Sequence, residues 1–167
     1  MCDPFTIVYN GIWSLLEASD EFTSMVKPGN RIKFTGDDRR DPLKREVSQA
    51  DLPEVRLICT ASTPHLMRTS NASTFKKTYE IQISSGSRMY DASCFPLEWI
   101  IFKALADWQA TLLALTWCGK KFVISAVPGS IRNGIAESDL NRGITGWASI
   151  WAVDVEMVFA TADLKGA

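Results

Sequence analysis

The sequence predicts an α+β fold: a single antiparallel or mixed β-sheet of about five strands, with a long helix and N-terminal helices packed on it. Two helical segments precede three strand-like segments, and a further helix precedes two more strands, so the order is not that of a doubly wound parallel sheet. Segment 76–84 alternates apolar and polar residues, which is typical of an antiparallel sheet with one hydrated face. The chain has 167 residues, which fits one domain, residues 1–167, with a sizeable core.

Two helices are predicted at the N-terminus. Asp3 followed by Pro4 is a helix-start signal, and the apolar residues that follow at helical spacing predict an amphipathic helix over about residues 4–18. Ser19 offers the cap of a short second helix. The turn residues 28–30, Pro-Gly-Asn, end that second helix.

Five strands are predicted, at about residues 31–35, 54–61, 76–84, 120–127 and 147–162. In the third strand, Tyr79, Ile81 and Ile83 are expected to face the core, and the residues between them, Glu80 included, to face solvent. In the last strand the expected core face consists of Trp147, Ser149, Trp151, Val153, Val155, Met157 and Phe159. Segments rich in turn residues are expected to be loops, at 36–53, 62–73 and 128–146.

A long helix is predicted over about residues 92–117, ended by the Cys-Gly pair that follows it. Within it, Trp99, Trp108 and Trp117 follow one another at intervals of two and a half helical turns, so successive rings point to opposite sides. A helix with aromatic side chains on both sides is buried against more than one layer. The second layer is either the chain's own core, which is the simpler interpretation, or a neighbouring subunit.

The apolar segment 97–117 has nearly the length of a membrane span. Glu98, Lys103 and Asp107 interrupt it, and charged side chains are costly in lipid. Lys103 and Asp107 are four residues apart and could pair on one helical face. We therefore expect a helix buried in a protein core, and no membrane association.

The cysteines and the single histidine lack the close grouping that a zinc site needs: Cys2, Cys59, Cys94, Cys118 and His65. Cys59 and Cys118 lie in or beside apolar segments and are expected to be buried. His65 lies in a predicted loop without a nearby catalytic partner, while Cys94 lies near the start of the long helix. The sequence thus predicts no metal, no cofactor and no enzyme, and the glycines form no phosphate-binding motif. The alternative is a small ligand-binding or enzymatic domain that uses Cys94 or His65 in a cleft between sheet and helix.

A dense charged segment follows the first predicted strand. Its acidic and basic residues balance, and the chain as a whole has a net charge of −1, so binding to free nucleic acid through phosphates is disfavoured. Interleaved charges are typical of the rim of a subunit contact, and equally of a solvated loop. The candidate interface residues are Asp37, Asp38, Arg39, Arg40, Asp41, Lys44 and Arg45.

The run "DPFTIVYNGIWSLLEASDEFTSMVKPGNRIKF" resembles the opening of phage tail-terminator and tail-completion proteins. These begin with a helix of the pattern I-x-x-x-[IL]-x-x-x-L, a short acidic D-x-x-[FL] helix, and G-x-R-I leading into a strand. The later segments "ADLPEVRLI", "TYEIQISSG" and "PLEWIIFKALADW" occur in the order expected for the family. The resemblance covers most of the chain, and consists mainly of hydrophobic pattern and turns. The length of segment 128–146 and the tryptophan-rich helix depart from the family pattern.

The resemblance implies a structural role in the virion. In the family that the chain resembles, small α+β subunits close into a homo-oligomeric ring, commonly a hexamer, at the head-proximal end of a tail tube. The implied partners are other copies of the chain, the tail tube protein and the neck or connector proteins, and DNA passes through the lumen without sequence-specific binding. The implied location is the tail or neck of a virion assembled in the host cytoplasm. Another neck or baseplate component is an alternative with the same expected fold.

Overall fold

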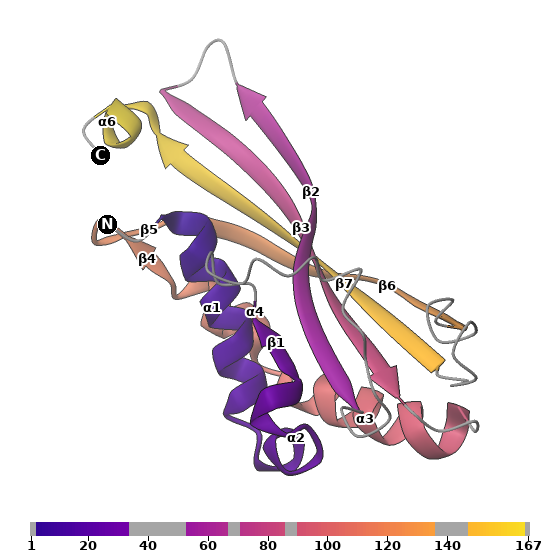
Figure 1. Ribbon diagram of the computed structural model, residues 1–167. Coiled ribbons are helices and arrows are strands. Elements are labelled where there is room, and N and C mark those ends of the chain that lie inside the picture. Colours follow the sequence, from indigo (N-terminus) through magenta and orange to yellow (C-terminus); the bar gives the residue numbers. More distant parts are fainter. Residues whose placement is uncertain (1–2, 34–52, 67–70, 86–89, 136–146, 166–167) are drawn as a thin grey trace.

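The computed structural model describes residues 3–33, 53–66, 71–85, 90–135 and 147–165 (Figure 1). In chain order the elements are α1 (Pro4–Glu17), α2 (Asp20–Met25), the 3₁₀ turn η1 (Pro28–Asn30), β1 (Arg31–Lys33), β2 (Glu54–Leu66), β3 (Ala72–Ser85), α3 (Tyr90–Ala104), α4 (Trp108–Leu113), β4 (Thr116–Trp117), β5 (Lys120–Lys121), β6 (Val123–Ile135), β7 (Trp147–Ala160) and α6 (Thr161–Lys165). The fold is α+β, as predicted.

The main sheet is mixed and has five strands in the order β1-β2-β3-β7-β6. Only the short β1 runs parallel to its neighbour β2, and the other three pairings are antiparallel. The central pair joins β3 to β7, and its register is unbroken from Ala72 opposite Ala160 to Ser85 opposite Trp147. The sheet that the sequence predicts is thus present. β2, β3 and β6 extend past their predicted bounds, whereas β1 ends at Lys33 and β7 at Ala160, before theirs.

The N-terminal helices begin where the sequence predicts. The Asp3 carboxylate accepts a hydrogen bond from the Thr6 backbone N–H at 2.9 Å, and the Ser19 hydroxyl accepts one from the Phe22 N–H at 3.3 Å. Each side chain satisfies a backbone donor that the first turn of its helix leaves without an intrahelical partner. Capping therefore fixes both starts, and α1 packs its buried side chains against the core: Val8, Ile12, Trp13 and Leu16.

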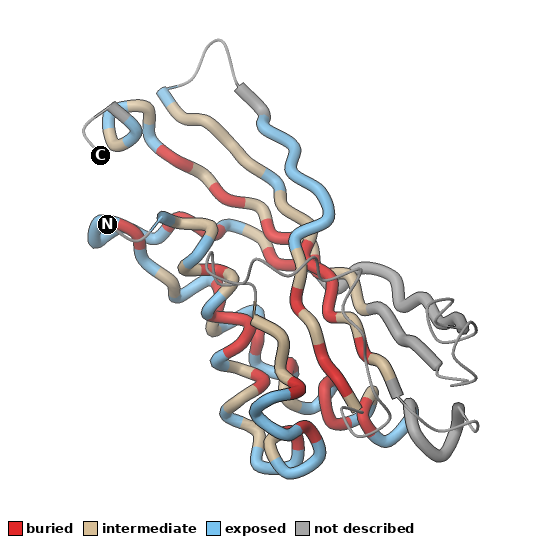
Figure 2. Tube along the Cα trace, viewed as in Figure 1, coloured by how far each residue is buried: buried red, intermediate tan, exposed pale blue. Residues whose placement is uncertain are grey.

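The core lies between the helices and one face of the sheet (Figures 1 and 2). Alternate residues of β3 and β7 are buried on this face, as their period of two requires: Tyr79, Ile81, Ile83, Val153, Val155, Met157 and Phe159. The expected solvent exposure of Glu80 is wrong, because this residue is only 7% exposed. The amide of Gln82, on the same face, donates to the Glu80 carboxylate at 3.2 Å.

Two predicted loops are partly strand. β2 continues to Leu66 and β3 begins at Ala72, so the strand pairing covers most of the predicted loop 62–73. β6 continues through Pro128 to Ile135, into the predicted loop 128–146. A proline is tolerated there because β6 is the terminal strand of the sheet and its register shifts beside Pro128. A prediction from turn residues alone therefore made these two loops longer than they are.

The predicted continuous helix over residues 92–117 is wrong. α3 ends at Ala104, a turn follows, and α4 runs only from Trp108 to Leu113. Asp107 lies at the N-cap position of α4, although its side chain makes no capping hydrogen bond there. The break lets α4 pack on β6, where the Gln109 amide donates to the Ala126 carbonyl oxygen at 3.1 Å. Among the described helices, none has the length and apolar character needed to cross a membrane.

The pair Cys118-Gly119 ends no helix, contrary to expectation. It forms the two-residue turn between β4 and β5, with φ of 50° at Cys118 and 75° at Gly119. Positive φ at both central residues is the requirement of the type I′ turn, the favoured connection of tight hairpins. Trp117 accordingly lies on a strand, where it is buried and meets Phe159 edge to face at 5.6 Å.

Candidate functional site

The charged segment predicted to be an interface lies outside the described residues. This applies to all seven candidates: Asp37, Asp38, Arg39, Arg40, Asp41, Lys44 and Arg45. Their role in a contact therefore stays a prediction.

The residues considered for chemistry lie apart from one another in the fold. His65 lies on β2, opposite Thr74 of β3, and not in a loop. Cys94 lies in the second turn of α3, which begins at Tyr90, and not in its first turn. Within the described part of the chain, no three His, Cys, Asp or Glu side chains are grouped to hold a metal ion.

The expected burial of Cys59 and Cys118 is wrong, since both thiols are exposed. Cys118 is exposed because it occupies the tip of a hairpin turn. Cys59 lies at a β-bulge, where β2 shifts register against β3. Its Sγ lies 3.8 Å from Lys77 Nζ and 3.8 Å from Ser62 Oγ, and Lys77 donates to Ser62 at 3.1 Å. This cluster joins side chains of β2 and β3 at the surface.

An open stretch of sheet edge begins at the same bulge. β1 pairs only with Val55–Leu57, so within the described residues no strand lies on the outer side of residues 58–64 of β2, which we term the open β2 edge. Every residue from Cys59 to Pro64 is exposed (Figure 2). The segment reads Ile-Cys-Thr-Ala-Ser-Thr-Pro and carries none of the charges that usually protect an edge. The bulge and Pro64 protect it only in part.

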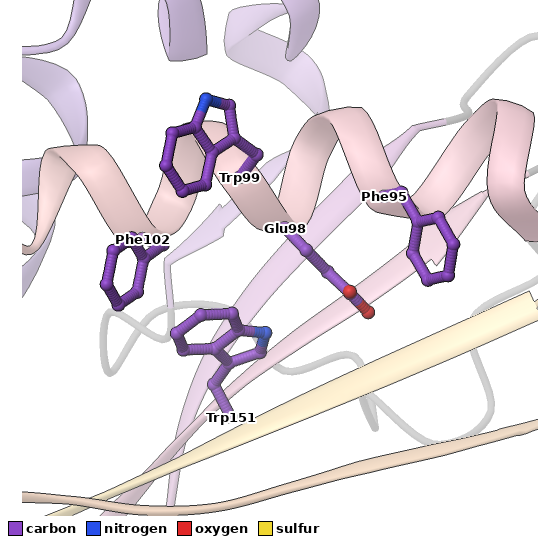
Figure 3. Close-up of a pocket in the computed structure, with 5 residues that line it drawn as sticks. All are labelled: Phe95, Glu98, Trp99, Phe102 and Trp151. Atoms are coloured by element: carbon purple, nitrogen blue, oxygen red, sulfur yellow. The ribbon is translucent and has the colours of Figure 1, made fainter.

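Among the residues whose side chains the structure describes, three exposed aromatic residues lie together on α3. Phe95, Trp99 and Phe102 are 53%, 59% and 55% exposed, although each is a large apolar side chain. With Glu98 and with Trp151 of β7 they line an open groove of about 320 Å³ (Figure 3). The Trp99 and Phe102 rings stack with centroids 5.7 Å apart, and Phe102 lies 6.2 Å from Trp151. We call Phe95, Trp99 and Phe102 the outer stripe of α3.

Two charged side chains of α3 belong to the surroundings of this stripe. Lys103 forms an ion pair with Glu21 of α2, and its Nζ lies 6.0 Å from the Trp99 ring centroid. The expected pairing of Lys103 with Asp107 is therefore replaced by a contact between helices, because Asp107 lies beyond the end of α3. Glu98 lines the groove between α3 and β7 (Figure 3). The groove thus offers aromatic surface and one carboxylate, which suits contact with a protein better than acid–base chemistry.

The sequence singled out Trp99 but not Phe95 or Phe102. The signal was present: these three residues follow at spacings of four and three, beside a second apolar series at Leu97, Ile101 and Leu105. The second series is buried and faces the core. Spacing reveals two apolar sides of a helix, but it does not reveal which side the chain itself covers.

An ion pair on the face of the sheet opposite the core stabilises the charged forms of Lys76 and Asp154. Lys76 Nζ lies 2.8 Å from an Asp154 carboxylate oxygen, and the Thr78 hydroxyl donates to the other oxygen at 2.5 Å. Partial burial acts to raise the pKa of Asp154, but the hydrogen bonds from Lys76 and Thr78 outweigh it and lower the pKa below its ordinary value. The Asp154 carboxylate in turn raises the pKa of Lys76. Neither group is poised to exchange a proton near neutral pH.

Tyr79 is a titratable side chain of the core whose pKa is shifted by burial. Burial raises the pKa of its phenol above the ordinary value, and the hydroxyl donates to the Phe5 carbonyl oxygen at 3.4 Å. The phenol stays protonated over the whole physiological range, so its role is structural.

Comparison with known proteins assigns no family. A search with protein-family models finds no match to the chain. A search of curated proteins finds no significant match either.

Proposed function

We propose that this chain is a structural virion protein that forms a ring at the head-proximal end of a phage tail. In this role it terminates the tail tube and joins it to the neck, and it is not an enzyme. Its partners are other copies of the chain, with six the expected number, the tail tube protein and the neck or connector proteins. DNA passes through the lumen of the ring, and the protein is assembled into virions in the host cytoplasm. The resemblance of the N-terminal segments to tail-terminator proteins is the origin of this proposal.

The observation that best supports a ring is the open β2 edge. A sheet edge with unpaired backbone groups binds an added strand through main-chain hydrogen bonds. The described sheet ends in two different edges, β1 with β2 on one side and β6 on the other. A contact between unlike edges is heterologous, and heterologous contacts close into rings when their rotation permits. The charged segment 37–45 remains a further candidate for the same contact.

Electron microscopy of the purified protein, alone and mixed with tail tubes, tests this function. We expect rings, or caps at one end of each tube. Ala61→Lys places a charge in the middle of the open β2 edge and is expected to abolish capping. Asn10→Lys adds the same charge at an exposed position of α1 and should leave capping intact.

If the protein forms no ring at high concentration and leaves tube ends bare, the proposal is wrong. If Ala61→Lys caps tubes as well as the unmodified protein does, the ring contact lies elsewhere on the subunit.

A further inference from the structure

α3 has apolar side chains on two sides. Its core side packs Leu97 and Ile101, both fully buried, into the molecule. Its outer stripe, defined above, leaves three aromatic rings more than half exposed. The stripe has the alternating spacing of four and three that forms the seam between two paired helices. A helix with such a seam is suited to bind another helix.

We propose that the outer stripe of α3 binds the α3 of a second copy of this chain, with the two helices parallel. The charges beside the stripe support this choice of partner. Glu98 precedes Trp99 and Lys103 follows Phe102, so the two charges lie on opposite flanks of the seam. In a parallel pair, residues five apart on these flanks meet across the seam, which brings Glu98 of each copy to the partner's Lys103. In an antiparallel pair the same flanks meet, so Glu98 would face Glu98.

The existing ion pair of Lys103 is compatible with this arrangement. Lys103 contacts Glu21 within its own chain, and an ammonium group has three donors, so a second carboxylate can be added. Glu98 lies on the flank of α3 that faces Trp151 (Figure 3). Lys103 lies on the flank that faces α2, where it contacts Glu21. In the parallel pair, α2 of one copy therefore lies opposite β7 of the other copy, and this holds on both sides of the seam.

The size of the stripe sets the expected strength of the pair. Three aromatic side chains that are about half exposed offer roughly 300 Å² of surface. A standard stable interface buries about 800 Å² on each partner. The contact should therefore be weak, and we expect the dimer to form only at concentrations on the order of 10 μM to 1 mM.

This contact goes beyond the proposed function. A two-fold contact joins the same patch on both copies and cannot by itself repeat around a cyclic ring. Loss of pairing through α3 and loss of tube capping are therefore separate results, obtained in separate assays.

Analytical ultracentrifugation of the full chain from about 10 μM to 1 mM tests the pairing, with reductant present because the thiols of Cys59 and Cys118 are exposed. We expect a reversible dimer. The double variant Trp99→Ala, Phe102→Ala should weaken it more than about 100-fold, since each truncation counts twice in a symmetric pair. Ile124→Ala, at a residue of β6 that is 50% exposed, is the matched control and should leave the dimer unchanged.

The charge pattern tests the orientation. Glu98→Lys creates two like-charge contacts in a parallel pair and should weaken the dimer about tenfold at low salt. Adding Lys103→Glu to this variant reverses both charges and should restore the dimer. Circular dichroism checks that each variant is folded.

A wild-type chain that is monomeric at 1 mM, or an aromatic double variant that still dimerises, would overturn the pairing. A charge-reversed double variant weaker than Glu98→Lys alone would overturn the parallel orientation.

Discussion

Asp3 shows how much one side chain determines at the start of a helix. Its carboxylate accepts hydrogen bonds from the backbone N–H of Thr6 and from the Thr6 hydroxyl, the latter at 2.6 Å. The hydroxyl hydrogen bond is the main cause that lowers the pKa of Asp3 below its ordinary value of 3.8, against a smaller opposing effect of burial. The folded state therefore binds this proton less tightly than the unfolded chain does.

We predict that Asp3→Ala lowers the free energy of unfolding by about 1 kcal/mol at pH 7, as loss of a cap usually does. Because the folded pKa is depressed, the charge contributes fully above the unfolded pKa of about 3.8 and ceases to contribute as pH falls through the lower folded value. Asp3→Asn keeps the cap without the charge, so it should retain most of the stability. Urea denaturation between pH 2 and 7 measures both variants, and an Ala variant as stable as the wild type at pH 7 would contradict the capping role.

At the scale of elements, the β4–β5 hairpin depends on backbone conformation more than on contacts. A Cβ at Gly119 would meet no atom within 4 Å, so space is not limiting, but φ is +75°. Side-chain-bearing residues adopt this conformation at a cost of roughly 1–2 kcal/mol. The turn therefore requires glycine at this position for conformational reasons alone.

We predict that Gly119→Ala lowers the free energy of unfolding by roughly 1 kcal/mol. Gly29→Ala is the control, because its Cβ also meets nothing within 4 Å and its φ is not positive. The control should be neutral or slightly stabilising, since alanine restricts the unfolded chain. Thermal unfolding of the two variants provides the comparison, and equal melting temperatures would be inconsistent with strain at Gly119.

The helices and strands also show how much of the fold could be predicted from the sequence. Local signals determine the helix starts at Asp3 and Ser19, and the period of two determines the core face of β3 and β7. The prediction of one continuous helix was wrong because apolar residues continue on both sides of Asp107. They give no local sign that α3 ends at Ala104 and that a separate helix, α4, begins at Trp108. The candidate site was only partly predictable, since composition cannot distinguish the exposed Trp99 from the buried Trp108. That distinction arises from tertiary packing, as does the open edge of β2.

For the whole molecule, stability and association depend on different residues. Met157 is fully buried on the inner strand β7, whereas Trp99 is mostly exposed on α3. We predict that Met157→Ala lowers the free energy of unfolding by about 2–5 kcal/mol, and that Trp99→Ala, despite the larger truncation, lowers it by less than about 1 kcal/mol. Guanidinium denaturation of dilute protein measures both. A larger loss for Trp99→Ala would mean that the outer stripe belongs to the core of the monomer.

The pairing of β3 with β7 has a consequence for biosynthesis. These neighbours at the centre of the sheet come from the middle of the sequence and from its last described strand. A nascent chain on the ribosome holds β2 and β3 long before β7 emerges, with Tyr79, Ile81 and Ile83 on a surface that β7 has not yet helped to enclose. Contacts between residues this distant in sequence slow folding, and they prolong the lifetime of aggregation-prone intermediates with exposed apolar surface. We therefore expect the yield of soluble protein to depend on how fast the sheet is completed once β7 has emerged.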